Sequence, residues 1–134
     1  MKKRIVIKSE VKNLRIIEKA IDEVSSEMKF SEDNYGKIMV SAMEAVNNAI
    51  IHGNKSDSNK TVIVEIKHIR NQLKICVEDE GPGFDPGIIP DPTKPENIEK
   101  LNGRGIFLMS RLTDKIEFNE KGNRVTMTFK DVGT

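Results

Sequence analysis

The sequence has little cysteine, few aromatic residues and no excess of charge of one sign. Its 134 residues include one cysteine, one tyrosine and no tryptophan. A single cysteine excludes a disulfide within the chain and a cysteine-based metal site. Lys and Arg number 22 and Asp and Glu 21, and this balance predicts neither a broad basic face for nucleic acid nor an acidic tail. Partners are therefore expected at local sites.

Long hydrophobic runs are also missing. No window approaches the ~20 apolar residues of a membrane span, and the opening MKKRIVIKSE has an apolar run of only three residues, too short for a secretory signal. These features predict a cytoplasmic protein with no membrane contact. A chain of this length buries a core without disulfide or metal support, so we expect a single domain over residues 1–134.

Hydrophobic periodicity predicts two helices in the first part of the chain. After a short strand at Arg4–Lys8, apolar residues recur at helical spacing over Val11–Met28. Ser31 is a suitable N-cap for a second helix that runs to about His52, where Gly53 ends it.

The second part of the chain alternates with a period of two. Two β-hairpins are predicted, the first with its turn at Asn71 and Gln72 and the second with its turn at Glu120–Asn123; their strands are Thr61–His68, Leu73–Val77, Lys115–Asn119 and Arg124–Lys130. Helices followed by strands indicate an α/β (α+β) fold, a two-layer sandwich with the helices on one face of a mainly antiparallel, mixed sheet. Cys76, in an alternating strand, is expected to be a small buried residue.

The second predicted helix carries polar residues inside an apolar run, EAVNNAIIHGN. Glu44 and Asn48 are four residues apart, so they lie on one face of a helix, and His52 extends this row. Burying such groups without partners costs roughly 1–3 kcal/mol each. The row therefore either faces solvent or lines a polar cavity. For His52 we expect packing or a hydrogen bond near the helix end.

A glycine turn follows the first hairpin. Asp79, Gly81 and Gly83 form Asp-x-Gly-x-Gly at a strand end, where glycines permit positive φ and close approach of a ligand to the backbone. Aspartate beside glycine is often only a turn former. In this setting its carboxylate can also accept hydrogen bonds from an exocyclic amine such as that of adenine.

Proline and glycine concentrate in the next segment. All five prolines and five of the nine glycines lie between Gly81 and Gly105. Long segments of this kind are usually lids, binding loops or linkers, and we interpret this one as a lid. It ends in a second glycine element, Asn102–Gly105, which opens the helical run Ile106–Leu112. Backbone N–H groups at a glycine turn before a helix suit phosphate, although such turns also occur without a ligand.

These three elements, in this order, resemble the signature of the GHKL ATPase superfamily, whose members share the Bergerat nucleotide-binding fold. The resemblance runs from the second helix to the last strand. The wording EAVNNAIIHGN and GRGIFLM is most similar to the anti-sigma-factor serine kinases of bacterial partner-switching systems.

The resemblance implies roles for individual residues. Glu44 would be the general base, Asn48 would ligate Mg²⁺, and Asp79 would recognise the adenine of ATP. Glycines would shape the pocket and hold phosphates through backbone N–H groups, with a basic side chain nearby; the full set of expected ATP-binding residues is Asn48, Asp79, Gly81, Gly83, Lys100, Gly103, Arg104 and Gly105.

Two positions depart from the family pattern. Related kinases carry a lid arginine just before the second glycine element, where this chain has Lys100 and Leu101; Lys100 or Arg104 would substitute, although lysine lacks the bidentate fork. Asn123 replaces a threonine after the glycine of the last hairpin, so an expected pocket or phosphate contact is in question.

The resemblance implies an ATP-dependent protein serine/threonine kinase. Its substrate would be an anti-sigma-factor antagonist; a sigma factor would be a second partner, and the first strand and helix would form a homodimer surface. The alternative is an ATP-binding regulatory module that switches partners without phosphoryl transfer. An ATP-hydrolysing fragment of a larger sensor is a third interpretation, which no linked sensory element supports.

Overall fold

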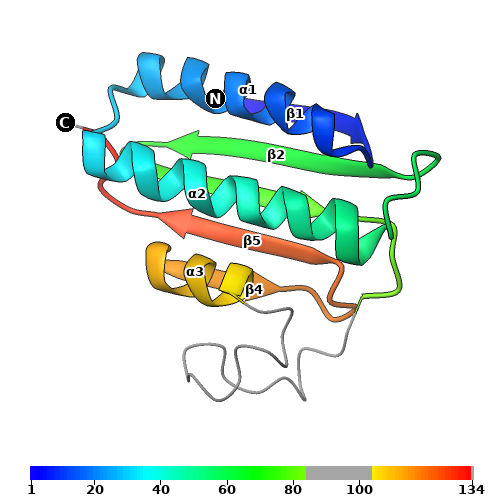
Figure 1. Ribbon diagram of the computed structural model, residues 1–134. Coiled ribbons are helices and arrows are strands. Elements are labelled where there is room, and N and C mark those ends of the chain that lie inside the picture. Colours follow the sequence, from blue (N-terminus) through cyan, green and yellow to red (C-terminus); the bar gives the residue numbers. More distant parts are fainter. Residues whose placement is uncertain (84–103, 134) are drawn as a thin grey trace.

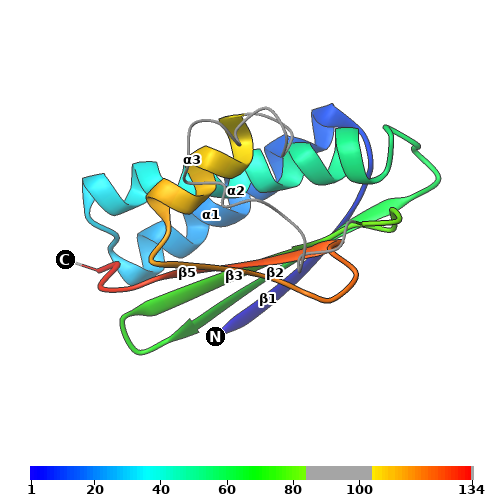
Figure 2. The same cartoon turned by 90° about the horizontal axis from the view of Figure 1, so that it is seen from below.

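The computed structural model describes residues 1–83 and 104–133, and for residues 104–107 only the backbone. Helices lie over one face of a five-stranded sheet, and no described helix covers the other face, called the open face below (Figures 1 and 2). The elements are β1 (Lys2–Lys8), the 3₁₀ turn η1 (Val11–Asn13), α1 (Leu14–Met28), α2 (Glu32–Asn48), the π-helical turn η2 (Ala49–Gly53), β2 (Thr61–Ile69), β3 (Gln72–Glu78), α3 (Arg104–Leu112), β4 (Lys115–Phe118) and β5 (Arg124–Phe129).

The sheet has the strand order β1-β2-β3-β5-β4. Every pairing among the described residues is antiparallel, where a mainly antiparallel, mixed sheet was expected. Ile66 of β2, Ile75 of β3 and Met127 of β5 lie side by side in this register. All three side chains are buried under the helices, so the predicted two-layer sandwich is confirmed.

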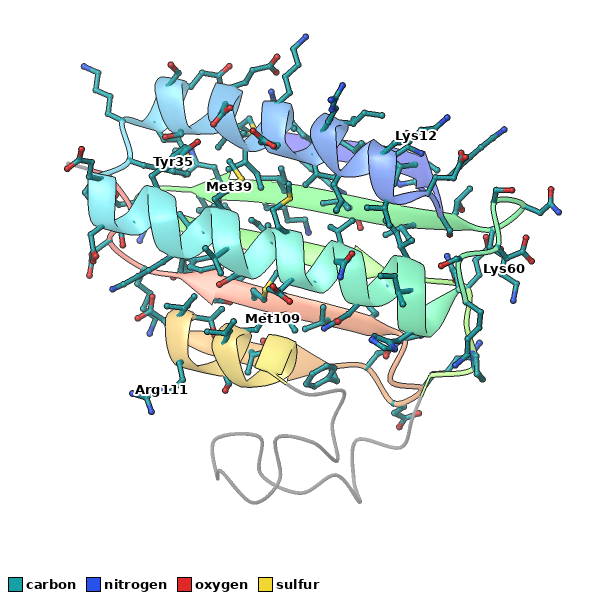
Figure 3. All side chains as sticks on the ribbon, viewed as in Figure 1. Lys12, Tyr35, Met39, Lys60, Met109 and Arg111 are labelled. Atoms are coloured by element: carbon teal, nitrogen blue, oxygen red, sulfur yellow. The ribbon has the colours of Figure 1, made fainter. Side chains whose placement is uncertain are left out.

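The helices contribute the other half of the core. Ile17, Ile21 and Val24 of α1 are buried at helical spacing, which is the periodicity that predicted this helix. Met39 and Met43 of α2 pack against the core, and Figure 3 shows Met39 between the two long helices and the sheet. Within the described residues, no helix combines the length and apolar character needed to cross a bilayer.

The start of α2 follows the capping prediction. Ser31 has extended backbone geometry, and its Oγ accepts the backbone N–H of Asn34 at 3.2 Å. Glu32 and Asp33 occupy the first turn, where the positive end of the helix dipole favours them. An N-cap of this kind satisfies one of the backbone donors that the helix itself leaves unpaired.

The open face of the sheet carries more positive charge than the composition suggests. Lys2, Lys67 and Lys74 lie side by side on β1, β2 and β3, and Lys115 of β4 is opposite Thr128 of β5 in the same row. All four lysines are exposed. Two of them pair with carboxylates of the same face, Lys2 with Glu65 at 3.4 Å and Lys115 with Glu117 at 3.6 Å, so the row does not contradict the expectation of no broad basic face.

Several boundaries differ from the sequence prediction. The first hairpin turns at Arg70 and Asn71, one residue earlier than expected, with Arg70 at φ 57°. A positive φ is uncommon for a residue with a side chain, so arginine gave no turn signal. The last helix begins at Arg104, two residues before Ile106. Cys76 is buried as expected, and its sulfur accepts Arg124 Nε–H at 2.7 Å on the open face.

Candidate functional site

The end of α2, the end of β3 and the β4–β5 turn meet at one end of the sheet (Figure 1). The first two carry the polar helix row and the Asp-x-Gly-x-Gly turn, which are separate in the sequence. Lys60, labelled in Figure 3, lies at the same end, in the segment that leads into β2. The end of α2, the end of β3 and the β4–β5 turn therefore form one candidate site.

Glu44 and Asn48 lie one helical turn apart on α2, as predicted, and both side chains are half-buried. The Nδ2 atom of Asn48 is buried and has no hydrogen-bond partner among the described residues. A buried unpaired amide costs roughly 1–3 kcal/mol. Such groups are uncommon in folded proteins; Ser41 Oγ and Thr128 Oγ1 are two others among the described residues. A ligand with acceptor oxygens would satisfy Asn48 Nδ2.

The helix does not continue regularly to His52. After Asn48 the chain makes a π-helical turn over Ala49–Gly53, in which the Asn54 N–H donates to the Ala49 carbonyl at 2.8 Å. The wider i→i+5 turn breaks the four-residue spacing of the row. His52 is exposed at this end, so the predicted row ends at Asn48.

Asp79 follows the last residue of β3 and is half-buried. Its Oδ1 accepts the backbone N–H of Gly81 at 2.8 Å. Burial raises the pKa of this carboxyl above its usual value, and the hydrogen bond from Gly81 opposes that shift. Among the described residues, the hydrogen bond to this carboxylate ends at Oδ1. The other oxygen, Oδ2, is therefore an acceptor that a ligand could use.

Glycine is required where the helix end meets this turn. A Cβ placed on Gly53 would lie 2.3 Å from both Cγ and Oδ2 of Asp79, and one on Gly81 would lie 2.1 Å from the Gly53 carbonyl oxygen. Gly83 has φ +70°, and a Cβ there would lie 2.1 Å from the Lys121 carbonyl oxygen. The structure therefore brings Gly81 and Gly83 into the same site as Asp79.

The remaining predicted site residues belong to the second glycine element. Lys100 and Gly103, and the predicted lid, lie outside the described residues. Arg104 and Gly105 are in the first turn of α3, whose backbone packs beside α2. The glycine element thus leads into a helix, as the sequence indicated.

Three asparagines at the site were missed or misjudged from the sequence. Asn54 is fully buried and accepts the Glu80 N–H at 2.7 Å. Asn123, noted only as a departure from a family pattern, donates to the Asp79 carbonyl at 2.7 Å and accepts from Asn119 at 2.8 Å. An asparagine directly after a helix-ending glycine was the available signal for Asn54.

The donor set is compatible with Mg²⁺ only in company with phosphates. Across residues 1–83 and 104–133 no cluster of three or more His, Cys, Asp or Glu side chains is suited to hold a metal. Mg²⁺ usually keeps several waters and is bound through one or two protein oxygens plus substrate phosphates. Asn48 has one such oxygen, Oδ1, whereas its unpaired atom is the donor Nδ2, which suits a phosphate oxygen rather than a cation.

Residues 7–129 match the family of histidine kinase-like ATPase domains. This match spans most of the chain, and the protein therefore belongs to that family. The predicted GHKL membership and the Bergerat fold are confirmed, and ATP is the nucleotide that membership implies.

Two named proteins are similar to this chain over more than two thirds of its length. The serine-protein kinase RsbW of Bacillus licheniformis is 32% identical over 124 residues, covering 84% of this chain and 75% of that protein. The anti-sigma F factor of Clostridium perfringens is 33% identical over 99 residues, covering 69% of this chain and 70% of that protein.

A solved structure supports the fold. The crystal structure of the RsbU and RsbW domains of a Mycobacterium tuberculosis protein matches 98% of this chain and 32% of that chain, with a TM-score of 0.67 and 16% identity. At this level of identity the likeness concerns the fold alone.

Proposed function

We propose that this chain is an ATP-dependent protein serine kinase of the anti-sigma-factor type. In this proposal it phosphorylates a serine or threonine of an anti-sigma-factor antagonist and also binds a sigma factor, so that phosphorylation decides which partner it holds. The similarity to RsbW kinases and an anti-sigma F factor supports this function. We further propose that residues 1–134 act as one domain in the cytoplasm, where sigma factors act.

The observation that carries the proposal is the buried Nδ2 of Asn48, a donor without a partner among the described residues that suits a phosphate oxygen, one turn from Glu44. We assign the Asn48 amide oxygen to Mg²⁺, which when bound neutralises phosphate charge. Asp79 accepts the adenine amino group, with Gly81 and Gly83 beside it. Gly103 and Gly105 hold phosphates through backbone N–H groups, and Lys100 or Arg104 replaces the usual lid arginine.

Glu44 acts as the general base. The attacking serine oxygen forms a bond to the γ-phosphorus while the bond from that phosphorus to the bridging β–γ oxygen breaks, and ADP leaves. The serine proton passes to the Glu44 carboxylate. Phosphoryl transfer requires little more of the protein than alignment of the nucleophile and neutralisation of charge, and one carboxylate within hydrogen-bond reach supplies the base.

A transfer assay tests the kinase proposal. The protein is incubated with γ-labelled ATP, Mg²⁺ and the candidate antagonist, and Glu44→Ala and Asn48→Ala are compared with wild type. We expect labelled antagonist with wild type, a loss of 10²-fold or more in Glu44→Ala, the usual contribution of a general base, and a loss of transfer in Asn48→Ala because a proposed Mg²⁺ ligand is removed. Glu27→Ala, at an exposed position of α1, and Asn47→Ala, next to Asn48, are the matched controls.

The outcomes separate the two functions. Label transfer by wild type and both controls, and by neither site variant, supports the kinase. If wild type binds ATP but transfers no label, and Glu44→Ala keeps nucleotide affinity and partner binding, the protein is instead the ATP-binding regulatory module.

We also propose that the protein forms a homodimer through its first strand and helix. β1 is an edge strand, and the exposed apolar side chains Val6, Val11 and Ile16 lie on β1, η1 and α1. Ile16→Glu should then halve the mass measured by light scattering. Val40→Glu, an exposed apolar residue of α2, is the control; a wild-type protein of monomer mass would refute the dimer.

A further inference from the structure

One peptide group beside Asp79 is held at both ends by asparagine side chains. The carbonyl of Asp79 and the N–H of Glu80 belong to the same peptide unit. Asn123 Nδ2 donates to that carbonyl at 2.7 Å, and Asn54 Oδ1 accepts that N–H at 2.7 Å. A trans peptide is planar, with its N–H and C=O pointing in opposite directions. The two amides therefore hold the plane from opposite sides.

Asn54 itself has no freedom to turn. Its side chain is fully buried, and Nδ2 donates to Ser9 Oγ at 2.7 Å and to the Thr61 carbonyl at 2.9 Å. A carbonyl only accepts and the Glu80 N–H only donates, so the partners fix which end of the amide is oxygen. Ser9 Oγ donates in turn to the Lys60 carbonyl at 2.9 Å. This network joins the ends of β1 and β3 to the start of β2.

Asn123 is held equally firmly from the other side. Its Oδ1 accepts Asn119 Nδ2–H at 2.8 Å, and its backbone carbonyl accepts the Asp79 N–H at 2.9 Å. Asn119 Oδ1 accepts the backbone N–H groups of Gly122, Asn123 and Arg124 at 2.8–3.1 Å. The β4–β5 turn is therefore ordered by its own hydrogen bonds.

We propose that Asn54 and Asn123 are positioning residues for nucleotide recognition, which fix the direction of the Asp79 carboxylate and thereby the selectivity for adenine over guanine. Holding the Asp79–Glu80 peptide plane fixes the backbone on both sides of it, and so the direction in which the Asp79 side chain leaves the chain. This inference rests on the proposed function, because it assigns Asp79 to the base of ATP.

We call the pair of side chains that hold this peptide, Asn54 and Asn123, the clamp. The property that it controls is the selectivity for ATP over GTP. Adenine presents an exocyclic amino group that donates to a carboxylate, whereas guanine presents a carbonyl oxygen at the corresponding position. A rigid carboxylate rejects that oxygen because two acceptors face each other and neither is satisfied. A carboxylate that turns away loses affinity for ATP and loses its rejection of GTP. Sites of this kind need positional precision of about 0.5 Å.

The experiment measures the affinities of wild type, Asn54→Ala and Asn123→Ala for ATP and GTP by calorimetry, each at a temperature where urea melts show it fully folded. We expect ATP affinity to fall about ten-fold in each variant, as for loss of one hydrogen bond. The ratio of ATP to GTP affinity should fall about as much. Asn71→Ala is the control, since Asn71 makes a similar side-chain bond, 2.8 Å to the Gly133 N–H, away from the site.

Each result has a distinct meaning. If Asn71→Ala keeps the wild-type ratio while the other two variants lose it, the clamp is established. If Asn54→Ala does not fold, Asn123→Ala carries the same test. An unchanged ratio in the folded variants would reduce both residues to structural ones and overturn the inference, whereas Asp79→Ala binding ATP as tightly as wild type would overturn the proposed function itself.

Discussion

Gly53 and Asp79, on different elements, approach so closely that there is no room for one methyl group between them. A Cβ on Gly53 would lie 2.3 Å from the Asp79 Cγ atom. The contact joins the end of the α2 segment, which carries Glu44 and Asn48, to the carboxylate expected to recognise adenine. The distance between these two parts of the site is therefore set by one glycine.

We expect Gly53→Ala to displace the Asp79 carboxylate. The added methyl should lower the free energy of unfolding by about 1–3 kcal/mol, the usual cost of overpacking, and lower ATP affinity at least ten-fold. Urea denaturation and calorimetry measure the two effects. Gly36→Ala is the matched control: it lies in α2 with no atom within 4 Å of an added Cβ, so it should stabilise the helix by about 1 kcal/mol.

A double-mutant cycle identifies the cause. In an Asp79→Ala background the carboxylate is gone, so Gly53→Ala should have almost no further effect on stability. A full additive loss in that background would show that the alanine clashes with something other than Asp79.

Asp79→Asn should make the nucleotide-free protein more stable at neutral pH. Because burial raises the pKa of Asp79 in the folded state, the folded protein binds a proton where the unfolded chain does not. The free energy of unfolding of wild type therefore falls as pH rises from about 4, the usual aspartate value, through the folded pKa. The variant, which keeps the oxygen that accepts the Gly81 N–H, lacks this loss.

The measurement is urea denaturation of both proteins from pH 4 to pH 8 without nucleotide. The advantage of Asp79→Asn should be largest above the folded pKa and shrink as pH falls through it. All other titrating groups are common to the two proteins, so their difference reports Asp79. An advantage that grows at low pH would contradict the prediction.

Asn48→Ala should also stabilise the nucleotide-free protein while weakening ATP binding that depends on Mg²⁺. The change removes the buried Nδ2 donor, which has no hydrogen-bond partner among the described residues, and alanine favours the helix. We expect a gain of about 1 kcal/mol in thermal or urea unfolding. Asn47→Ala removes the same group one position away. If that variant gains as much, helix propensity alone explains the effect.

Ser31→Ala should destabilise α2 by about 0.5–2 kcal/mol, the usual cost of losing an N-cap. The Ser31 Oγ accepts the Asn34 N–H at the start of the helix, and alanine leaves that donor unpaired. Urea denaturation measures the loss. Ser26→Ala, at an exposed position inside α1, should be neutral or slightly stabilising.

Repeating patterns made the long elements predictable. Ile17, Ile21 and Val24 recur at helical spacing, and Val62, Val64 and Ile66 alternate, so one buried face defines each element. Ser31 marked the start of α2 because its capping role needs only nearby backbone. Asp79 could be singled out because a carboxylate beside two glycines suits ligand contact whatever the rest of the fold.

Features that depend on distant residues could not be predicted. Asn54 acts by contacting Ser9, Thr61 and Glu80, which come together only when three strands end at the same place. Gly53 was interpreted as a helix stop, and its tight contact with Asp79 is a property of the packed structure. Arg70 adopts a turn conformation with positive φ that local preference disfavours.

The π-helical turn over Ala49–Gly53 holds one residue more per hydrogen-bonded ring than ordinary helix. Deleting that extra residue would produce a more regular helix, but it would swing everything after it by about 100° around the axis. Gly53 would lose its contact with the Asp79 carboxylate, and Asn54 would lose its hydrogen bond to the Glu80 N–H. A regular helix here would thus weaken the proposed nucleotide site. Insertions or deletions within Ala49–Gly53 should therefore be tolerated far less than in the loop that follows.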